Sequence, residues 1–330
     1  ARLAMLRIRG VRALHAATKF LPQAARKPTP PSPPPAFQLQ RELSRAAVPQ
    51  SNCLSGPGKD QQRGMSGSAG GGLVSVEVGD SGVATIFLNS MTMPPAFFSA
   101  IKDAMDSIQA DSRVRCVVLR AGTANKHFSY GLDLKEAAKG FAGIPMDGPR
   151  HELRKLIAEW QGGFTAVAKS PKPVVAAISG WCIGAGVELI SAADIRVCSK
   201  DAKFSLKEAE LGIVADLGGL QRLPPIIGAG ATRHLALTAA TISASEAYSL
   251  SLVTAVHDDA AATYAAAEAI AVRIASFDPH AMAGIKSVLE FQENKTADEG
   301  LAFVASHNAG LLDVTQIVAA LKAIESKIKK

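Results

Sequence analysis

The chain has 330 residues, 48% of them hydrophobic, which is enough for one large domain or two small ones with a sizeable core. The sequence has no run of 18 or more apolar residues, which argues against a transmembrane helix. The net charge of +7 combines +9 in residues 1–72 with −2 in the remainder, so we do not expect the folded part to bind nucleic acid.

The N-terminal segment is basic and poor in acids. Residues 1–26 contain no Asp or Glu, and apolar residues separate their basic side chains, which are Arg2, Arg7, Arg9, Arg12, Lys19 and Arg26. This composition is typical of a mitochondrial transit peptide; a disordered basic tail is the alternative. Six prolines in 28–35 and then Gly, Ser and Gln up to Gly72 favour an extension without a packed core. We therefore predict that residues 1–72 are a transit peptide and extension.

Cysteine and histidine spacing gives no sign of a disulfide framework or a metal site. The four cysteines form no CxxC pair, and the seven histidines form no HxH or HExxH pattern. Three of the cysteines, Cys116, Cys182 and Cys198, lie in apolar stretches, where the side chain usually acts as a small buried hydrophobe. We expect a reducing compartment and no bound metal.

The first elements expected after Gly72 are strands and a helix. Alternating valines from Val74 to Val78, the turn Asp80-Ser81-Gly82 and the apolar run Val83–Leu88 indicate a β-hairpin. Pro94-Pro95 is expected to open a helix that ends near Ile108. The run Val114–Leu119 is typical of a buried strand.

Further along the chain, helices and strands are expected to alternate. Apolar residues recur at helical spacing at Leu153, Leu156, Ile157, Trp160, Phe164 and Val167. Pro173–Ile178 and Ile195–Cys198 are strand-like runs. This alternation predicts an α/β core with parallel pairing over residues 73–260. Residues 261–330 show helical patterns only, and Thr296 with Glu299 forms a capping box that would open the last long helix.

Two glycine-containing segments could supply backbone amides to a ligand. The first, His127–Leu134, passes from a polar loop through Gly131 into a short predicted helix, although an ordinary loop would look similar. The second, Gly180–Leu189, follows a strand with small residues that let a backbone approach a ligand, although close helix–strand packing would use the same residues. Amides from the two segments could converge on one carbonyl oxygen as an oxyanion hole.

A third segment, Phe204–Pro224, places two acids among apolar and small residues. Glu208 and Asp216 would lose hydration there, which raises a carboxyl pKa toward the working pH and suits general acid–base chemistry. The alternative is that these carboxylates cap helices or pair with Lys207 and Arg222.

In their order and spacing, the three segments resemble the crotonase (enoyl-CoA hydratase/isomerase) superfamily, and the similarity runs from about Leu73 to the C-terminus. The resemblance implies an α/β fold built as a spiral of ββα units, followed by C-terminal helices that mediate trimer contacts. It also implies that the backbone N–H groups of Leu132 and Ala185 form the oxyanion hole. Most members have Gly where this chain has Ala185, a change that keeps the amide.

Within the superfamily, the third segment is most similar to that of the Δ3,5-Δ2,4-dienoyl-CoA isomerases, which share Lys207-Glu208, Val214-Ala215-Asp216 and Gln221-Arg222-Leu223-Pro224. That resemblance implies that Asp216 removes the C2 proton and Glu208 delivers a proton at C6. Hydratases carry Glu at the positions of Glu188 and Glu208 and Gly at that of Asp216, whereas the isomerases usually have Asp at 188. We therefore expect Glu188 to tune the pair electrostatically, with a 2-enoyl-CoA hydratase as the alternative.

The resemblance also implies the partners. The substrate would be an acyl-CoA thioester in fatty-acid β-oxidation, with no separate cofactor and no metal, and the assembly a homotrimer or hexamer. A crotonase-fold subunit recruited into a larger mitochondrial assembly through its N-terminal arm is a further alternative. Because the last residues, Ile328-Lys329-Lys330, are not an SKL-type peroxisomal signal, we expect the mitochondrial matrix.

Overall fold

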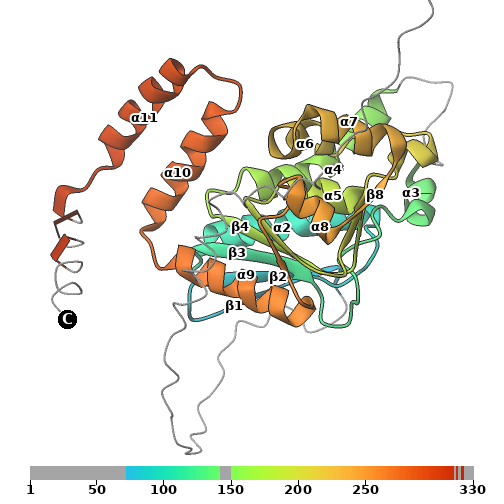
Figure 1. Ribbon diagram of the computed structural model, residues 1–330, viewed down its shortest axis with the longest axis horizontal. Helices are drawn as coiled ribbons and strands as arrows, with labels where there is room; N and C mark the ends of the chain where they lie inside the picture. The colour runs from blue at the N-terminus through green and yellow to red at the C-terminus, as the bar shows by residue number, and fades with distance from the viewer. Residues whose placement is uncertain (1–71, 142–149, 316, 319–320, 323–330) are drawn as a thin grey trace, which may run out of the picture. The chain divides into compact units, whose positions relative to one another are not determined.

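Six strands form the main sheet of the computed structural model, which describes residues 72–141, 150–315, 317–318 and 321–322 (Figure 1). Their order is β1-β2-β3-β4-β6-β9, with β1 antiparallel to β2 and the other pairs parallel. The bounds are β1 Val74–Val78, β2 Val83–Leu88, β3 Cys116–Ala121, β4 Val174–Ile178, β6 Ile195–Ser199 and β9 Ala255–His257. The predicted hairpin and the parallel α/β core are confirmed. The predictions for residues 1–71, including the transit peptide, lie outside the described residues.

The parallel strands are buried on both faces, which explains their continuous apolar runs. Along β3, Val117 and Leu119 join the larger hydrophobic cluster on one face, while Cys116 and Val118 join a second cluster on the other. Successive strand residues point to opposite faces, so a sheet covered on both sides needs apolar residues at every position. Helix α9 (Ala260–Ala275) covers the second face, with alanines packed on the strands (Figure 1).

A second sheet consists of three short strands. They lie in the order β5-β7-β8, and their bounds are β5 Trp181–Ile183, β7 Lys203–Ser205 and β8 Thr241–Ser243. Strands β4 and β6 of the main sheet are each followed along the chain by a strand of this small sheet, namely β5 and β7. No pattern in the sequence marks these strands, since three residues are too few to display a period of two.

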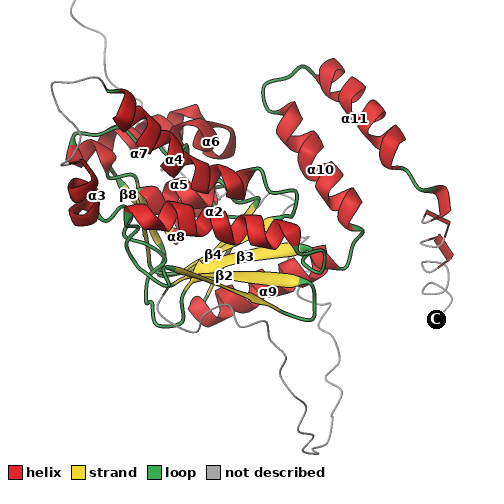
Figure 2. Cartoon of the chain, turned by 180° about the vertical axis from the view of Figure 1, so that it is seen from behind, coloured by secondary structure: helices red, strands yellow, loops and turns green. Residues whose placement is uncertain are grey.

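Helices α2 (Pro95–Ala110) and α4 (His151–Ala168) pack closely against each other on the first face of the main sheet (Figure 2). A Cβ on Gly163 of α4 would lie 2.5 Å from the carbonyl oxygen of Phe98, so the two backbones nearly touch. The Trp160 ring also stacks on the Phe98 ring, with centroids 5.1 Å apart. This contact fixes α4 relative to the core.

The remaining helices lie along the chain between β3 and β9 or follow the core. Those before β9 are α3 Leu134–Phe141, α5 Ala185–Ser191, the 3-10 helix η1 Glu208–Leu211, α6 Gly219–Ile227, α7 Ala229–Thr238 and α8 Ala244–Ser249, and α5 and α8 contact the small sheet. After α9, helices α10 (Pro279–Gln292) and α11 (Ala297–Leu311) pack on each other through the stacked rings of Phe291 and Phe303. The capping box of Thr296 and Glu299 is confirmed at the start of α11.

Three buried free cysteines, Cys116, Cys182 and Cys198, lie in the described part of the chain, as predicted. None of the helices in the described ranges is both long and apolar enough to cross a membrane.

Candidate active site

The two glycine-containing segments lie side by side because their backbones pair. An isolated parallel bridge joins Ser129 to Cys182. The Ser129 N–H donates to the Trp181 carbonyl oxygen at 2.9 Å, and the Ile183 N–H donates to the Ser129 carbonyl oxygen, also at 2.9 Å. This pairing brings the segment of Leu132 next to the segment of Ala185.

Gly131 allows the closest approach between the two segments. Its φ of +85° is a left-handed conformation that favours glycine. A Cβ at this position would lie 2.8 Å from the Ile183 carbonyl oxygen and 3.4 Å from the Ala185 nitrogen. Any side chain would therefore separate the backbone at Leu132 from the Ala185 amide.

The amides of Leu132 and Ala185 remain available to a ligand. Met93 forms backbone hydrogen bonds with the residues on either side of Leu132. Its N–H donates to the Gly131 carbonyl at 2.8 Å, and its carbonyl accepts from the Asp133 N–H at 3.0 Å. In such a parallel bridge the N–H of Leu132 itself points away from Met93. Within the described part of the chain, neither the Leu132 N–H nor the Ala185 N–H donates to an acceptor. The pair has the composition of an oxyanion hole.

Glu208 lies beside the Ala185 amide. The preceding Gly184 has φ +53°, and a Cβ there would lie 2.8 Å from Glu208 Oε1. The other oxygen, Oε2, is buried and has no hydrogen-bond partner among the described residues. Burial raises the pKa of the Glu208 carboxyl, and the charge of Asp216 raises it further. These surroundings favour a protonated carboxyl that can donate to a ligand.

Asp216 lies in the loop between η1 and α6, close enough to Glu208 and Glu188 for its charge to act on both. The residue as a whole is exposed, but neighbouring atoms partly desolvate its carboxyl and raise its pKa. An accessible carboxylate whose pKa is raised suits a general base. Thus the structure brings together all five residues singled out in the sequence.

Glu188, on α5, is almost completely buried and binds the loop of Asp216. Its Oε2 accepts hydrogen bonds from the Leu217 N–H at 2.9 Å and the Gly219 N–H at 2.8 Å. Burial raises the pKa of Glu188 to about 8, an increase that the two amides partly offset and the charges of Glu208 and Asp216 reinforce. Besides any electrostatic influence on the other two acids, Glu188 therefore holds the backbone next to Asp216.

The alternative pairing of the acids with Lys207 and Arg222 is not found. Lys207 Nζ instead pairs with Glu210 Oε1 at 2.7 Å and donates to the Ala239 carbonyl. Arg222 Nη1 donates to the Leu217 carbonyl at 3.2 Å. Glu208 and Asp216 thus carry no direct ion pair in the described structure. Burial lowers the pKa of Arg222, and the charge of Glu188 offsets part of this decrease.

Gln161 on α4 was not predicted from the sequence, yet its side chain also reaches the loop of Asp216. Gln161 Nε2 donates to the Asp216 carbonyl oxygen at 2.6 Å. No motif marks this residue; the one available signal is its position beside the buried Trp160 at the edge of the apolar face of α4.

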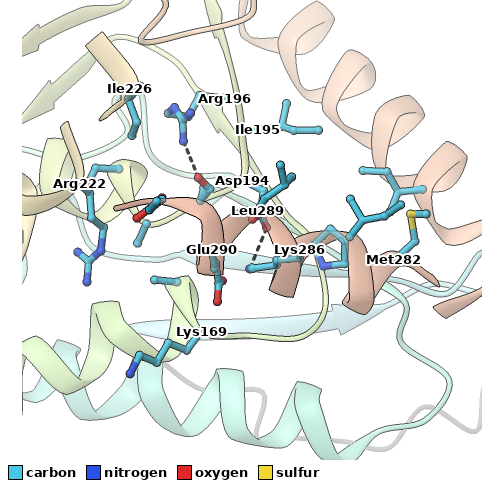
Figure 3. Close-up of a pocket in the computed structure, with 18 residues that line it drawn as sticks. Lys169, Asp194, Ile195, Arg196, Arg222, Ile226, Met282, Lys286, Leu289 and Glu290 are labelled. Carbon is cyan, nitrogen blue, oxygen red and sulfur yellow. Dashed lines mark hydrogen bonds and ion pairs between the residues drawn. The ribbon is translucent and has the colours of Figure 1, made fainter. Parts of the chain in front are cut away.

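A separate cavity of about 670 Å³ lies between the core and α10 (Figure 3). It is lined by both charged and apolar side chains, among them Asp194, Arg222 and Lys286, but by none of the five predicted site residues. Within the described ranges, no group of three or more His, Cys, Asp or Glu side chains is placed to hold a metal ion.

The sequence is similar to curated proteins over most of its folded part. It is 39% identical over 224 residues to a Dictyostelium discoideum protein named Delta(3,5)-Delta(2,4)-dienoyl-CoA isomerase, mitochondrial, covering 67% of this chain and 76% of the relative. It is also 39% identical over 240 residues to an Arabidopsis thaliana protein named Delta(3,5)-Delta(2,4)-dienoyl-CoA isomerase, peroxisomal, covering 71% and 85%.

The fold is shared with solved structures. A crystal structure of an enoyl-CoA hydratase from Bacillus anthracis superposes with a TM-score of 0.70 at 29% identity, covering 78% of this chain and 97% of that one. The predicted crotonase-like α/β fold is therefore confirmed. The sequence profile of the family described as Enoyl-CoA hydratase/isomerase matches residues 79–322, most of the chain, and the chain belongs to this family.

Proposed function

We propose that this enzyme isomerises 3,5-dienoyl-CoA to 2,4-dienoyl-CoA in fatty-acid β-oxidation. The observation that carries the proposal is the grouping of Asp216 and Glu208, two acids in different surroundings, around a free amide pair. The names of the Dictyostelium and Arabidopsis relatives support it. The acyl-CoA thioester is the substrate, and the reaction needs no separate cofactor.

In the proposed mechanism, the thioester oxygen accepts hydrogen bonds from the N–H groups of Leu132 and Ala185. Asp216 takes a proton from C2, and the electron pair of the C–H bond moves into a dienolate whose oxygen the two amides stabilise. Glu208 then gives a proton to C6, so that the two double bonds come to lie at C2 and C4. Asp216 ends protonated and Glu208 ionised, and one proton must return to Glu208 before the next turnover.

The different surroundings of the two acids support this division of roles. Glu208 has a buried oxygen without a partner, and burial raises its pKa, which favours the protonated form that donates. Asp216 is exposed and only partly desolvated, which favours the ionised form that accepts a proton. Activity is expected to fall at low pH as Asp216 becomes protonated and at high pH as Glu208 ionises.

The hydratase alternative requires Glu188 and Glu208 to hold a water between them. One oxygen of Glu188 already accepts two backbone N–H groups, which disfavours that role. Hydration of crotonyl-CoA should therefore be slow compared with isomerisation of a 3,5-dienoyl-CoA. A larger rate on crotonyl-CoA would favour the hydratase.

The decisive experiment separates the two proton transfers. In D2O, Asp216→Asn should abolish both isomerisation and deuterium uptake at C2 of a 3,5-dienoyl-CoA, because no base remains. Glu208→Gln should lower isomerisation by about 10²–10⁴-fold yet still allow deuterium uptake at C2, because it removes only the donor. Mass spectrometry of recovered substrate gives the exchange rate, and product absorbance gives the isomerisation rate. Native-rate isomerisation by Asp216→Asn would refute the assigned role.

We also propose the mitochondrial matrix as the compartment and a homotrimer or hexamer as the assembly. The name of the Dictyostelium relative and the acid-poor composition of residues 1–26 support a mitochondrial location, whereas the Arabidopsis relative is named peroxisomal. Exposed leucines on the C-terminal helices, including Leu289 and Leu301, support assembly.

A further inference from the structure

The peptide group that joins Asp216 to Leu217 is hydrogen-bonded at both ends by side chains from two different helices. Its carbonyl oxygen accepts from Gln161 Nε2 of α4 at 2.6 Å. Its N–H donates to Glu188 Oε2 of α5 at 2.9 Å. Two bonds on opposite edges of one planar group restrict its rotation, and hence the ψ angle of Asp216.

The helix that carries Gln161 is itself fixed in place. The Gly163 backbone of α4 lies against Phe98 of α2, and the Trp160 ring, one residue before Gln161, stacks on the Phe98 ring. Gln161 therefore donates from a rigid element to a loop whose neighbouring residues Ile213 and Val214 are exposed. A proton-abstracting group supported from such an element keeps its geometry better than one carried by the loop alone.

We propose that Gln161 is a positioning residue that holds Asp216 in line with the proton it removes. The proposal rests on the proposed isomerase function. The hydrogen bond from Gln161 goes to the main chain of Asp216 and not to its carboxyl, so we assign it no part in the proton transfers. Without this bond the peptide group keeps the Glu188 bond at its N–H, and Arg222 still holds the Leu217 carbonyl, but the Asp216 carbonyl end is released. The Asp216 carboxyl is then free to turn toward water.

Two kinetic consequences separate positioning from a merely structural role. Misplacing a catalytic group by about 1 Å can cost about 10²-fold in rate, while thioester binding on the Leu132 and Ala185 amides is untouched. The kcat should therefore fall and KM should not. A carboxyl that turns into water also loses the desolvation that raises its pKa, so the acidic limb of the pH–rate profile should move to lower pH. The other charged groups around this loop, Glu188, Glu208 and Arg222, are unchanged.

The test compares the full-length wild-type enzyme with Gln161→Met, which removes the donor but keeps the length of the side chain. Isomerisation of a 3,5-dienoyl-CoA is measured across pH, together with the melting temperature. We expect kcat to fall by about 10- to 100-fold, KM to stay within about twofold and the acidic limb to shift to lower pH. Gln161→His, whose ring N–H can donate, should recover part of the rate. Gln109→Met, an exposed change on α2, is the matched control and should resemble the wild type.

The outcomes are distinguishable. If Gln161→Met retains kcat within about twofold of the wild type, or loses kcat without any movement of the acidic limb, the positioning role is overturned while the isomerase function stands. If the wild type itself fails to isomerise 3,5-dienoyl-CoA, the function and the inference built on it both fall.

Discussion

Glu188 is the residue at which this chain departs from the aspartate usual in the isomerases it resembles, and its contacts give that departure a physical role. The side chain spans from α5 to the loop, where one oxygen satisfies two buried amides. A Cβ on Gly219 would lie 2.7 Å from Cγ of Glu188, so the loop is closely packed on this side chain. The longer side chain of Glu188 therefore reaches and holds the loop of Asp216, in addition to any electrostatic effect of its carboxyl.

The burial of Glu188 has an energetic cost that depends on pH. In the folded chain the pKa of Glu188 is about 8, above the ordinary 4.5 expected after unfolding. The folded state thus binds this proton more tightly, so its contribution lowers the free energy of unfolding as pH rises from about 4.5 to about 8. Below that window the group is protonated in both states, and above it ionised in both.

Glu188→Gln should remove this pH dependence, because the amide oxygen of Gln can still accept both N–H groups and carries no charge. The free energy of unfolding of the variant, relative to that of the wild type, should increase from about pH 5 to about pH 9, by up to about 5 kcal/mol. Thermal unfolding at the two pH values measures the difference. Glu159→Gln, an exposed change on α4, is the control and should show no such gain. An equal stability difference at both pH values would contradict the prediction.

Among the elements, α10 is joined to the core by a largely buried ion pair. Lys286 Nζ lies 3.0 Å from Asp194 Oδ2, and only 8% of the Lys286 side chain is exposed (Figure 3). The same oxygen accepts the Val174 N–H at 2.7 Å, so one carboxylate connects α10 to the start of β4. Apolar side chains of α10, Met282 and Leu289 among them, line the cavity beside this pair.

Lys286→Met should therefore loosen α10 from the core. Breaking a buried pair leaves the partner charge poorly compensated, but Asp194 is partly exposed and keeps one backbone hydrogen-bond donor. We therefore expect the free energy of unfolding to fall by about 1–3 kcal/mol. Thermal unfolding measures the loss, and limited proteolysis near Phe277 should become faster. The control Lys155→Met breaks an exposed pair with Glu152 and should cost less than about 0.5 kcal/mol. Equal effects of the two changes would show that the Lys286–Asp194 pair does not hold α10 to the core.

The C-terminal helices expose several large apolar side chains, an arrangement that is unfavourable for a monomer in water. Leu289 is 65% exposed on α10, Leu301 is 64% exposed on α11, and Leu312 and Val314 beyond α11 are exposed as well. Clusters of this kind usually mark a surface that another protein covers. Contact with further copies of this chain is the assembly that we propose for them.

Leu301→Arg should therefore weaken assembly. A charged side chain in an apolar interface would have to be buried without a partner, so the chain should shift toward smaller species at micromolar concentration. Sedimentation velocity reports the distribution. Ala302→Arg adds the same charge to an adjacent exposed position of α11 that faces a different direction, and should leave the distribution closer to that of the wild type. A wild-type chain that sediments as a monomer would rule out the proposed trimer or hexamer.

Patterns in the sequence predict the α/β core, because a continuous apolar run such as that of β3 follows directly from burial on both faces. Acids in apolar surroundings marked Glu208 and Asp216, whereas Leu132, Ala185 and Glu188 were assigned through the resemblance to the crotonase superfamily. The strands of the small sheet were not predicted, because three residues are too few to show a periodic pattern. Only the folded chain shows that Glu188 binds two loop amides and that Gln161 reaches the Asp216 carbonyl. These contacts join residues 29 to 55 positions apart, and their partners are backbone groups, which every residue carries and no motif can mark.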